Sequence, residues 1–436
     1  MARGGVDVRV ARDADGTVRI AAGPAPGHVE ASDDLAAGGP DFTRAVLDVA
    51  GAVLVWPVLG DPGPPSAWVH DPERAQQWLW ALYGERVAAA VHDRPARDLG
   101  GVRVAAEPTA LAGGAARLGL GHWAARWWPA SYPDGIPALE PDVHGLELAA
   151  LTHRCQQLFD DGDDQPDDCA AHLVGEHRAA LDPLVRWWLG APGPATTARR
   201  LESVLRLIDA AADGAGLDGP ELRRLRSALE RHGPAGAPVD PGELFAPHDR
   251  YALAAGEPPT AGGRVIARGS GINDWRRYPP GLVDAAESAV SWTVRALGAR
   301  RRIEVEVLAL GTAPAAGAPL FAEVLVNGGG PLRVPLTGRY DLWTGGFELG
   351  PELGPEPAAG ATPPRVEVGV LLPGFDPGPG PSGEADARAA REAVRALVGR
   401  RLAAAARPPA YEGSPHDTPT APFLAETTAA TTDEEY

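Results

Sequence analysis

Lysine is absent from this chain, and all 40 of its basic residues are arginines. The phosphate loop of P-loop NTPases, the ATP-binding strand of protein kinases and the Schiff-base site of pyridoxal phosphate enzymes each require a lysine at a fixed position. The missing lysine therefore excludes these three enzyme classes in their ordinary form.

Cysteine and long apolar segments are also scarce. Two cysteines in 436 residues cannot form a disulfide framework. The longest apolar run, residues 49–59, contains a proline and is far shorter than the roughly 20 residues that a membrane-spanning helix needs. The first twenty residues carry charges throughout and lack the apolar stretch of a signal peptide. We therefore expect a cytoplasmic protein that does not enter a membrane.

The charge balance is strongly acidic. The chain has 58 acidic against 40 basic residues, a formal net charge of −18. Nucleic acids and anionic lipid surfaces would repel such a chain at long range. We expect a protein partner and neither a nucleic acid nor a membrane.

The first half of the chain shows mainly helical periodicity. Alternating valines on either side of Asp15-Gly16 predict a β-hairpin inside a small α/β segment over residues 1–60. Asp71-Pro72 is a typical helix start, and an apolar stripe with helical spacing follows it. Residues 61–232 are predicted to form a helical domain. Its last helix, over residues 220–231, has an arginine-rich exposed face made of Arg223, Arg224 and Arg226.

The apolar period changes to two after a Pro/Gly-rich linker over residues 233–263. Six short alternating segments follow, at 290–294, 303–307, 322–326, 332–336, 347–349 and 366–370. They predict an antiparallel Ig-like β-sandwich with a C-terminal helix over residues 264–406. Residues 407–436, which carry six carboxylates and one arginine, are predicted to be a disordered acidic tail. The expected fold is an α+β multidomain protein.

One cluster of residues resembles a metal-ligand set. His153-x-Cys155 and Cys169-x-x-His172 lie on either side of an acidic loop at 160–168, and an antiparallel helical hairpin would bring them together. Two thiolates and two imidazoles suit tetrahedral zinc. However, Cys155 lies on an apolar stripe and His153 faces about 200° away from it on a helix. A buried cysteine with ordinary surface histidines is the alternative interpretation.

Other motifs do not assemble into catalytic chemistry. The histidines at 172 and 177 are five residues apart and diverge on a helix, which excludes a metalloprotease pair. The acidic loop lacks the glycine and glutamate that an EF-hand calcium loop requires. No serine lies in a G-x-S-x-G nucleophile elbow. We therefore assign no catalytic or cofactor-binding residue.

Tryptophan is unusually common, with twelve residues against seven phenylalanines and seven tyrosines. Most of these rings are expected to fill helical cores. The pairs Trp127-Trp128 and Trp187-Trp188 stand out because adjacent helical residues point about 100° apart, which places one ring of each pair near the surface. These four residues are a candidate interaction surface.

The sequence favours a non-catalytic cytosolic interaction or accessory protein, in effect an adaptor. Two alternatives remain open. One is a metal-dependent hydrolase with zinc at His153, Cys155, Cys169 and His172. The other is a protein that binds a small ligand or glycan through tryptophan.

Overall fold

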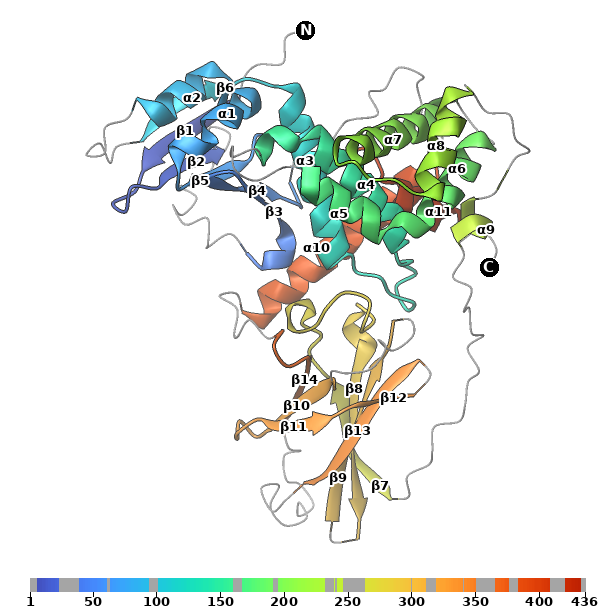
Figure 1. Ribbon diagram of the computed structural model, residues 1–436. Coiled ribbons are helices and arrows are strands. Elements are labelled where there is room, and N and C mark those ends of the chain that lie inside the picture. The colour runs from blue at the N-terminus through green and yellow to red at the C-terminus, as the bar shows by residue number, and fades with distance from the viewer. Residues whose placement is uncertain are drawn as a thin grey trace. The chain divides into compact units, whose positions relative to one another are not determined.

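The chain forms two compact units in the computed structural model (Figure 1). Unit 1 consists of Met1–Ala125, Leu139–Ala246 and Pro381–Tyr436, and unit 2 of Arg126–Ala138 and Pro247–Gly380. The structure describes residues 6–22, 39–60, 63–93, 101–159, 167–190, 195–231, 239, 241–245, 263–298, 300–310, 319–339, 341–349, 365–375, 383–407 and 420–432. Both units are discontinuous in sequence, because each is built from segments separated by the other.

Unit 1 contains a six-stranded antiparallel sheet with the strand order β3-β4-β5-β2-β1-β6. Its strands are β1 (Val6–Arg12), β2 (Val18–Ala22), β3 (Arg44–Val49), β4 (Ala52–Pro57), β5 (Ser66–Val69) and β6 (Val102–Ala106). The hairpin predicted at Asp15-Gly16 joins β1 to β2, and Gly16 adopts the positive φ of 95° that this turn requires. The alternating residues Val8, Val10 and Ile20 are fully buried, which explains the two-residue period of these strands.

This sheet corrects the prediction of a mainly helical N-terminal region. Two of its strands, β5 and β6, fall inside the range predicted to be helical. Strand β5 has only four residues, and β6 leaves Val102 exposed, so hydrophobic periodicity gives only a weak signal for either strand. Only pairing with β2, β4 and β1 makes these segments strands.

Three helices accompany the sheet: α1 (Pro72–Tyr83), α2 (Glu85–His92) and α3 (Ala110–Trp127). Helix α1 begins where the sequence predicts, because the Asp71 carboxylate accepts hydrogen bonds from the backbone N–H groups of Glu73 and Arg74. Its apolar stripe is buried, and the Trp78 indole donates a hydrogen bond of 2.8 Å to the carbonyl of Ala50.

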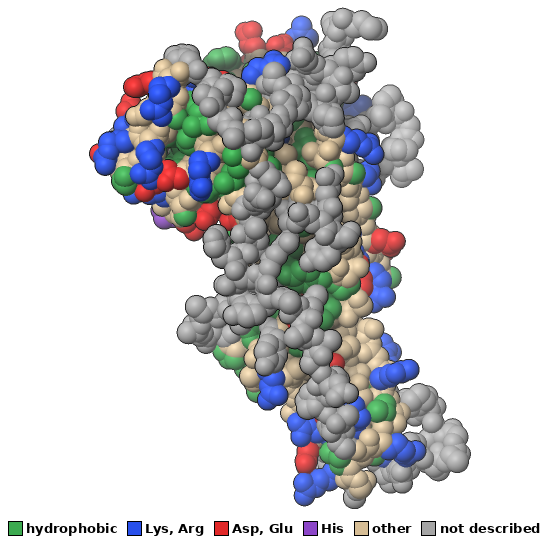
Figure 2. Space-filling view, turned by 90° about the vertical axis from the view of Figure 1, so that its right-hand side faces the viewer, with side chains coloured by type: hydrophobic (Ala, Val, Ile, Leu, Met, Phe, Trp, Pro, Cys, Tyr) green, Lys and Arg blue, Asp and Glu red, His purple; other side chains and the backbone are tan. Residues whose placement is uncertain are grey.

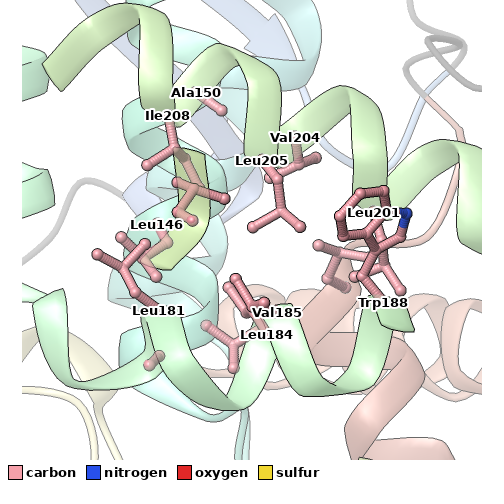
Figure 3. Close-up of a cluster of buried hydrophobic side chains, with 14 of the residues drawn as sticks. Leu146, Ala150, Leu181, Leu184, Val185, Trp188, Leu201, Val204, Leu205 and Ile208 are labelled. Atoms are coloured by element: carbon pink, nitrogen blue, oxygen red, sulfur yellow. The ribbon is translucent and has the colours of Figure 1, made fainter. Parts of the chain in front are cut away.

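The remaining helices of unit 1 all contribute to one apolar core, with the exception of α10. They are α4 (Pro141–Arg154), α5 (Asp167–Glu176), α6 (Leu181–Leu189), α7 (Ala195–Gly214), α8 (Pro220–Glu230), α9 (Pro241–Phe245), α10 (Glu384–Ala405) and α11 (Leu424–Thr432). Figure 3 shows Leu201 and Leu205 of α7 directed toward Leu184 and Trp188 of α6, with Leu146 of α4 beside them. These five side chains are buried, and their removal from water stabilises the helical layer.

Helices α10 and α11 correct two expectations about the C-terminal region. Helix α10 is part of unit 1 and not of the strand-rich unit with which the sequence groups it. The tail predicted to be disordered contains α11, whose residues Leu424 and Ala425 belong to the core of the helical layer. Residues 408–419 and 433–436 of that tail, and most of the linker over 233–263, lie outside the described residues.

Unit 2 contains two antiparallel sheets. The five-stranded sheet has the order β12 (Thr337–Arg339), β13 (Leu342–Leu349), β9 (Arg300–Leu308), β8 (Val290–Leu297) and β7 (Arg264–Ser270). The three-stranded sheet has the order β11 (Leu332–Pro335), β10 (Phe321–Val326) and β14 (Val366–Leu371). Each of the six alternating segments predicted from the sequence contributes a strand to one of these sheets.

The Ig-like topology predicted for this region is wrong. An immunoglobulin domain places its second and third strands in opposite sheets. Here the second and third strands, β8 and β9, are separated only by residues 298–299 and pair as a hairpin within one sheet. Alternation identifies strands and their buried face, but the length of each connection determines which sheet a strand joins.

The segment Arg126–Ala138 is held against the loop that precedes β8 by polar contacts to its backbone. The backbone N–H of Tyr132 donates to the Asp284 carboxylate at 2.8 Å, and the N–H of Ala285 donates to the carbonyl of Ala130 at 3.0 Å. Asp284 is completely buried, and its other oxygen accepts from the N–H of Ala286. These bonds explain why this short segment belongs to unit 2.

Across the described part of the chain, no helix combines the length and the apolar character that crossing a bilayer demands.

Candidate binding groove

The four residues proposed as zinc ligands do not form a ligand set in the described part of the chain. Cys155 is completely buried after α4, whereas Cys169 and His172 are exposed on α5 and His153 is half-buried. No group of three or more His, Cys, Asp or Glu side chains among the described residues is placed to hold a metal ion. Most of the acidic loop between the two pairs lies outside the described residues.

The surroundings of Cys155 are those of a structural cysteine. Its sulfur lies near Gly114 of α3, where a Cβ atom would be only 3.2 Å away. Burial raises the pKa of the Cys155 thiol to about 12 and outweighs the opposing effect of Arg154. A thiol with this pKa is protonated at neutral pH and is therefore a poor nucleophile.

The two tryptophan pairs differ in their surroundings. Trp187 and Trp188 are each only 2% exposed, so both lie in the core and neither reaches the surface. Trp127 and Trp128 are half-buried in unit 2. The guanidinium of Arg126 lies 3.9 Å from the centroid of the Trp127 ring, and the Trp128 indole donates to the carbonyl of Pro137.

A concave surface feature lined by both polar and apolar side chains lies between α6 and α8 of unit 1. The cavity has a volume of about 710 Å³. Its apolar wall is formed by Val185, Leu189, Pro220 and Ala228, and its polar rim by Asp182, Arg186, Arg223, Arg224, Ser227 and Arg231. We call this feature the arginine groove. It contains four arginines and one acidic residue, on a chain whose net charge is −18.

Two ion pairs organise the rim of the arginine groove. Arg224 of α8 donates to both oxygens of Asp182 on α6, at 2.8 and 2.5 Å. These hydrogen bonds raise the pKa of Arg224. Arg223 pairs with Asp218 at 2.7 Å, although both side chains are more than half exposed. Exposed pairs of this kind exchange readily for other carboxylates, because each is worth only about 0–1 kcal/mol.

The other two arginines of the groove present their guanidinium groups to solvent. Arg186 and Arg231 are exposed, and neither forms an ion pair with another described residue. A guanidinium presents five N–H donors in a planar fork that matches a carboxylate. Figure 2 looks onto the side of the molecule where α6 and α8 lie in Figure 1 and shows arginine side chains spread among acidic and apolar ones there.

The sequence indicated part of this groove. Two of the three arginines singled out on α8, Arg223 and Arg224, line it, whereas Arg226 instead pairs with Asp209 of α7 at 2.8 Å. The contribution of Arg186 was missed, because it lies 37 residues before Arg223 in the sequence and only the packing of α6 against α8 brings the two together.

Comparison with known proteins leaves the groove without a described counterpart: no protein-family model, no curated protein and no solved structure matches this chain.

Proposed function

We propose that this protein is a non-catalytic interaction protein that binds an acidic peptide segment of a protein partner in the arginine groove. One observation carries the proposal: four arginines surround an apolar wall on a strongly acidic chain, and two of them lack an ion-pair partner among the described residues. The groove runs between two helices, a geometry that suits an amphipathic helical segment.

The charge pattern supports a peptide rather than a nucleic acid as the occupant. A long polyanion would meet the net charge of −18 beyond the groove, whereas a short acidic segment meets only the local arginines. The apolar wall supplies the contact area that carboxylates alone do not, because exposed ion pairs contribute little to affinity.

A titration with a defined probe tests the proposal. The probe is a fluorescein-labelled synthetic amphipathic peptide that carries leucine on one face and glutamate along both borders of that face. We expect saturable binding that weakens as salt is raised, and no binding of the same peptide with glutamine in place of glutamate. Replacing both unpaired arginines, in Arg186→Glu/Arg231→Glu, should weaken binding at least tenfold, because two attractions become repulsions.

The matched control is Arg206→Glu on α7, an exposed arginine outside the groove that pairs with Glu202. This variant should bind the probe as the parent protein does. Equal binding of the probe by the parent and by the double variant would refute the proposed function.

A further inference from the structure

The C-terminal segment of the described chain, residues 420–432, is bound to unit 1 as a peptide ligand is bound to a receptor. We call these residues the docked segment. Its helix α11 packs against α4, α9 and α10, and Figure 1 shows it among the helices of unit 1. Four successive residues, Phe423 to Glu426, are at most 1% exposed. The segment follows α10 through residues 408–419, which lie outside the described residues.

Buried charged side chains hold the backbone of the docked segment. Arg117 of α3 donates to the carbonyls of Ala421 and Pro422 at 2.7 and 3.1 Å. From the opposite direction, Glu147 of α4 accepts the backbone N–H of Leu424 at 2.6 Å. Arg117 and Glu147 are also paired with each other at 2.8 Å and are 3% and 2% exposed. Charge-assisted hydrogen bonds between buried side chains and the main chain are strong, and they fix the segment in one register.

The aromatic residue of the segment fills a cationic pocket. The guanidinium groups of Arg117 and Arg401 lie 4.6 and 5.4 Å from the centroid of the Phe423 ring. His144 contacts the same ring edge-on, with centroids 5.1 Å apart, while its Nε2 donates to the carbonyl of Gly121. Burial lowers the pKa of His144, so this imidazole is neutral and adds no third positive charge around the ring. Cation–π contacts of this kind are strongest when they are desolvated.

Arg401 of α10 depends entirely on the docked segment. Its guanidinium donates to both oxygens of Glu426 at 2.6 and 2.8 Å and to the carbonyl of Ala421 at 3.3 Å. Among the described residues, every hydrogen-bond and ion-pair partner of this side chain lies in the segment. Without the segment, Arg401 would lose the carboxylate of Glu426, while Arg117 and Arg200 would keep only the carboxylate of Glu147. The pocket is therefore charged so as to receive a glutamate.

We infer that these side chains form a peptide-binding pocket for which residues 420–432 are an exchangeable ligand, and that the pocket accepts the same segment from a second copy of this chain. The pocket recognises a phenylalanine that is followed directly by a leucine and, three residues after the phenylalanine, by a glutamate. Exchange preserves every contact, so the two arrangements differ only in the entropy of the connecting residues and in protein concentration. The inference uses a different face of unit 1 from the arginine groove and does not depend on it.

The test uses the full-length chain. A recognition sequence for a site-specific protease is placed within residues 408–419, the protein is folded, and the connection is then cut. A fluorescein-labelled synthetic peptide of residues 420–436 stands for the segment of a second copy. We expect the cut chain to take up this peptide saturably. The intact chain should exclude it, because its own segment competes at an effective concentration on the order of millimolar.

Peptide variants separate specific recognition from general adhesion. The Phe423→Ala peptide should bind the cut chain roughly a hundredfold more weakly, because the cationic pocket loses its ring. The Glu426→Gln peptide should bind the cut chain at least thirtyfold more weakly, because Arg401 is then buried without a carboxylate partner. Thr431→Ala is the matched control, since its hydroxyl bonds only to carbonyls of its own helix, and it should bind within about threefold of the parent peptide.

Three results would overturn the inference. The first is a cut chain that keeps its circular dichroism spectrum and takes up no peptide. The second is equal binding of the Phe423→Ala and parent peptides. The third is unfolding of the protein upon cutting, because the segment would then be an integral part of the core of unit 1 and not a ligand of it.

Discussion

At the scale of single residues, buried charge is concentrated around Glu147. One carboxylate oxygen accepts from Arg117 and from Arg200, each at 2.8 Å, and the side chain is 2% exposed. Burial by itself would raise the pKa of Glu147. The attraction of Arg200 and Arg117, together with their hydrogen bonds, outweighs this and lowers it to about 2. The network thus ties α3, α4 and α7 together through one ionised group.

The depressed pKa of Glu147 predicts an acid-sensitive contribution to stability. An unfolded glutamate has a pKa near 4.3, so the stabilisation is complete above about pH 5 and is lost as pH falls toward 2. We expect this contribution to be about 3 kcal/mol at neutral pH. Urea unfolding of the Glu147→Gln variant at pH 7 should show a free energy of unfolding lower than that of the parent by this amount. Between pH 7 and pH 3, the free energy of unfolding should fall less for the variant than for the parent.

The control for this prediction is Glu202→Gln, which removes an exposed carboxylate paired with Arg206 on the same helix. It should change the free energy of unfolding by about 0.5 kcal/mol or less. A Glu147→Gln variant that is as stable as this control would show that the buried network contributes nothing.

The two cysteines should differ in reactivity because only one of them is exposed. With a thiol reagent such as Ellman's reagent, we expect Cys169 to react rapidly in the native protein. Cys155, buried and with a pKa of about 12, should react only when unit 1 opens. Absorbance should therefore report one fast thiol and a second that appears in denaturant. Two fast thiols in the native protein would contradict the burial of Cys155.

At the scale of secondary structure, small residues determine how closely the helices of unit 1 approach one another. Gly119 of α3 lies against the ring of Trp56, and Gly121 lies against Leu148 of α4. In α4 itself, a Cβ atom on Gly145 would overlap the ring of His177. Glycines lower the helical propensity of these segments, which is why the sequence pattern over α3 is indistinct. The close packing that glycine permits offsets this loss of helix stability.

Gly145→Ala and Gly399→Ala should have opposite effects on stability. At Gly145 the added methyl group must displace the His177 ring, whose Nδ1–H donates a hydrogen bond to the Asp142 carboxylate, so we expect a loss of about 1–3 kcal/mol. At Gly399, in the middle of α10, nothing lies within 4 Å of the added Cβ, and alanine should stabilise the helix by about 0.5–1 kcal/mol. Denaturant unfolding measures both. A loss at both positions would indicate that helix propensity does not limit α10.

At the scale of the whole molecule, the chain passes from unit 1 into unit 2 and back twice, yet each unit has its own core. In unit 2, the segment Arg126–Ala138 is held by a hydrogen bond to Asp284. In unit 1, helix α11 and the residues before it are held by hydrogen bonds to Glu147 and Arg401. A buried carboxylate in each unit therefore anchors a segment that is remote in sequence.

Separate cores predict separable unfolding. Asp284→Ala should lower the thermal transition of unit 2, because two backbone N–H groups lose their acceptor, at about 1–3 kcal/mol for each. Glu147→Gln should lower the transition of unit 1. Differential scanning calorimetry of the two variants should thus show different parts of the heat-absorption curve shifting. Identical shifts in both variants would mean that the molecule unfolds as one cooperative body.

Much of the local structure followed from short-range pattern. The capped start of α1, the hairpin at Asp15-Gly16 and the six alternating strands of unit 2 were all predictable, because caps, turns and periodicity act between residues close in sequence. The strands β5 and β6 and the helix α11 were not predictable. Their short or weakly patterned segments depend on partners from elsewhere in the chain.

Composition determined the overall charge and the exclusion of lysine-dependent chemistry, and the spacing of apolar residues determined the presence of strand-forming and helix-forming regions. Tertiary structure alone decided which segments share a unit, that Trp187 and Trp188 are buried, and that Cys155 does not join a metal-ligand set with Cys169 in the described chain. It also decided that Arg117, Glu147, Arg401 and Glu426 meet. The reason is physical: local preferences depend on neighbouring residues, whereas burial and charge pairing depend on which distant surfaces come into contact.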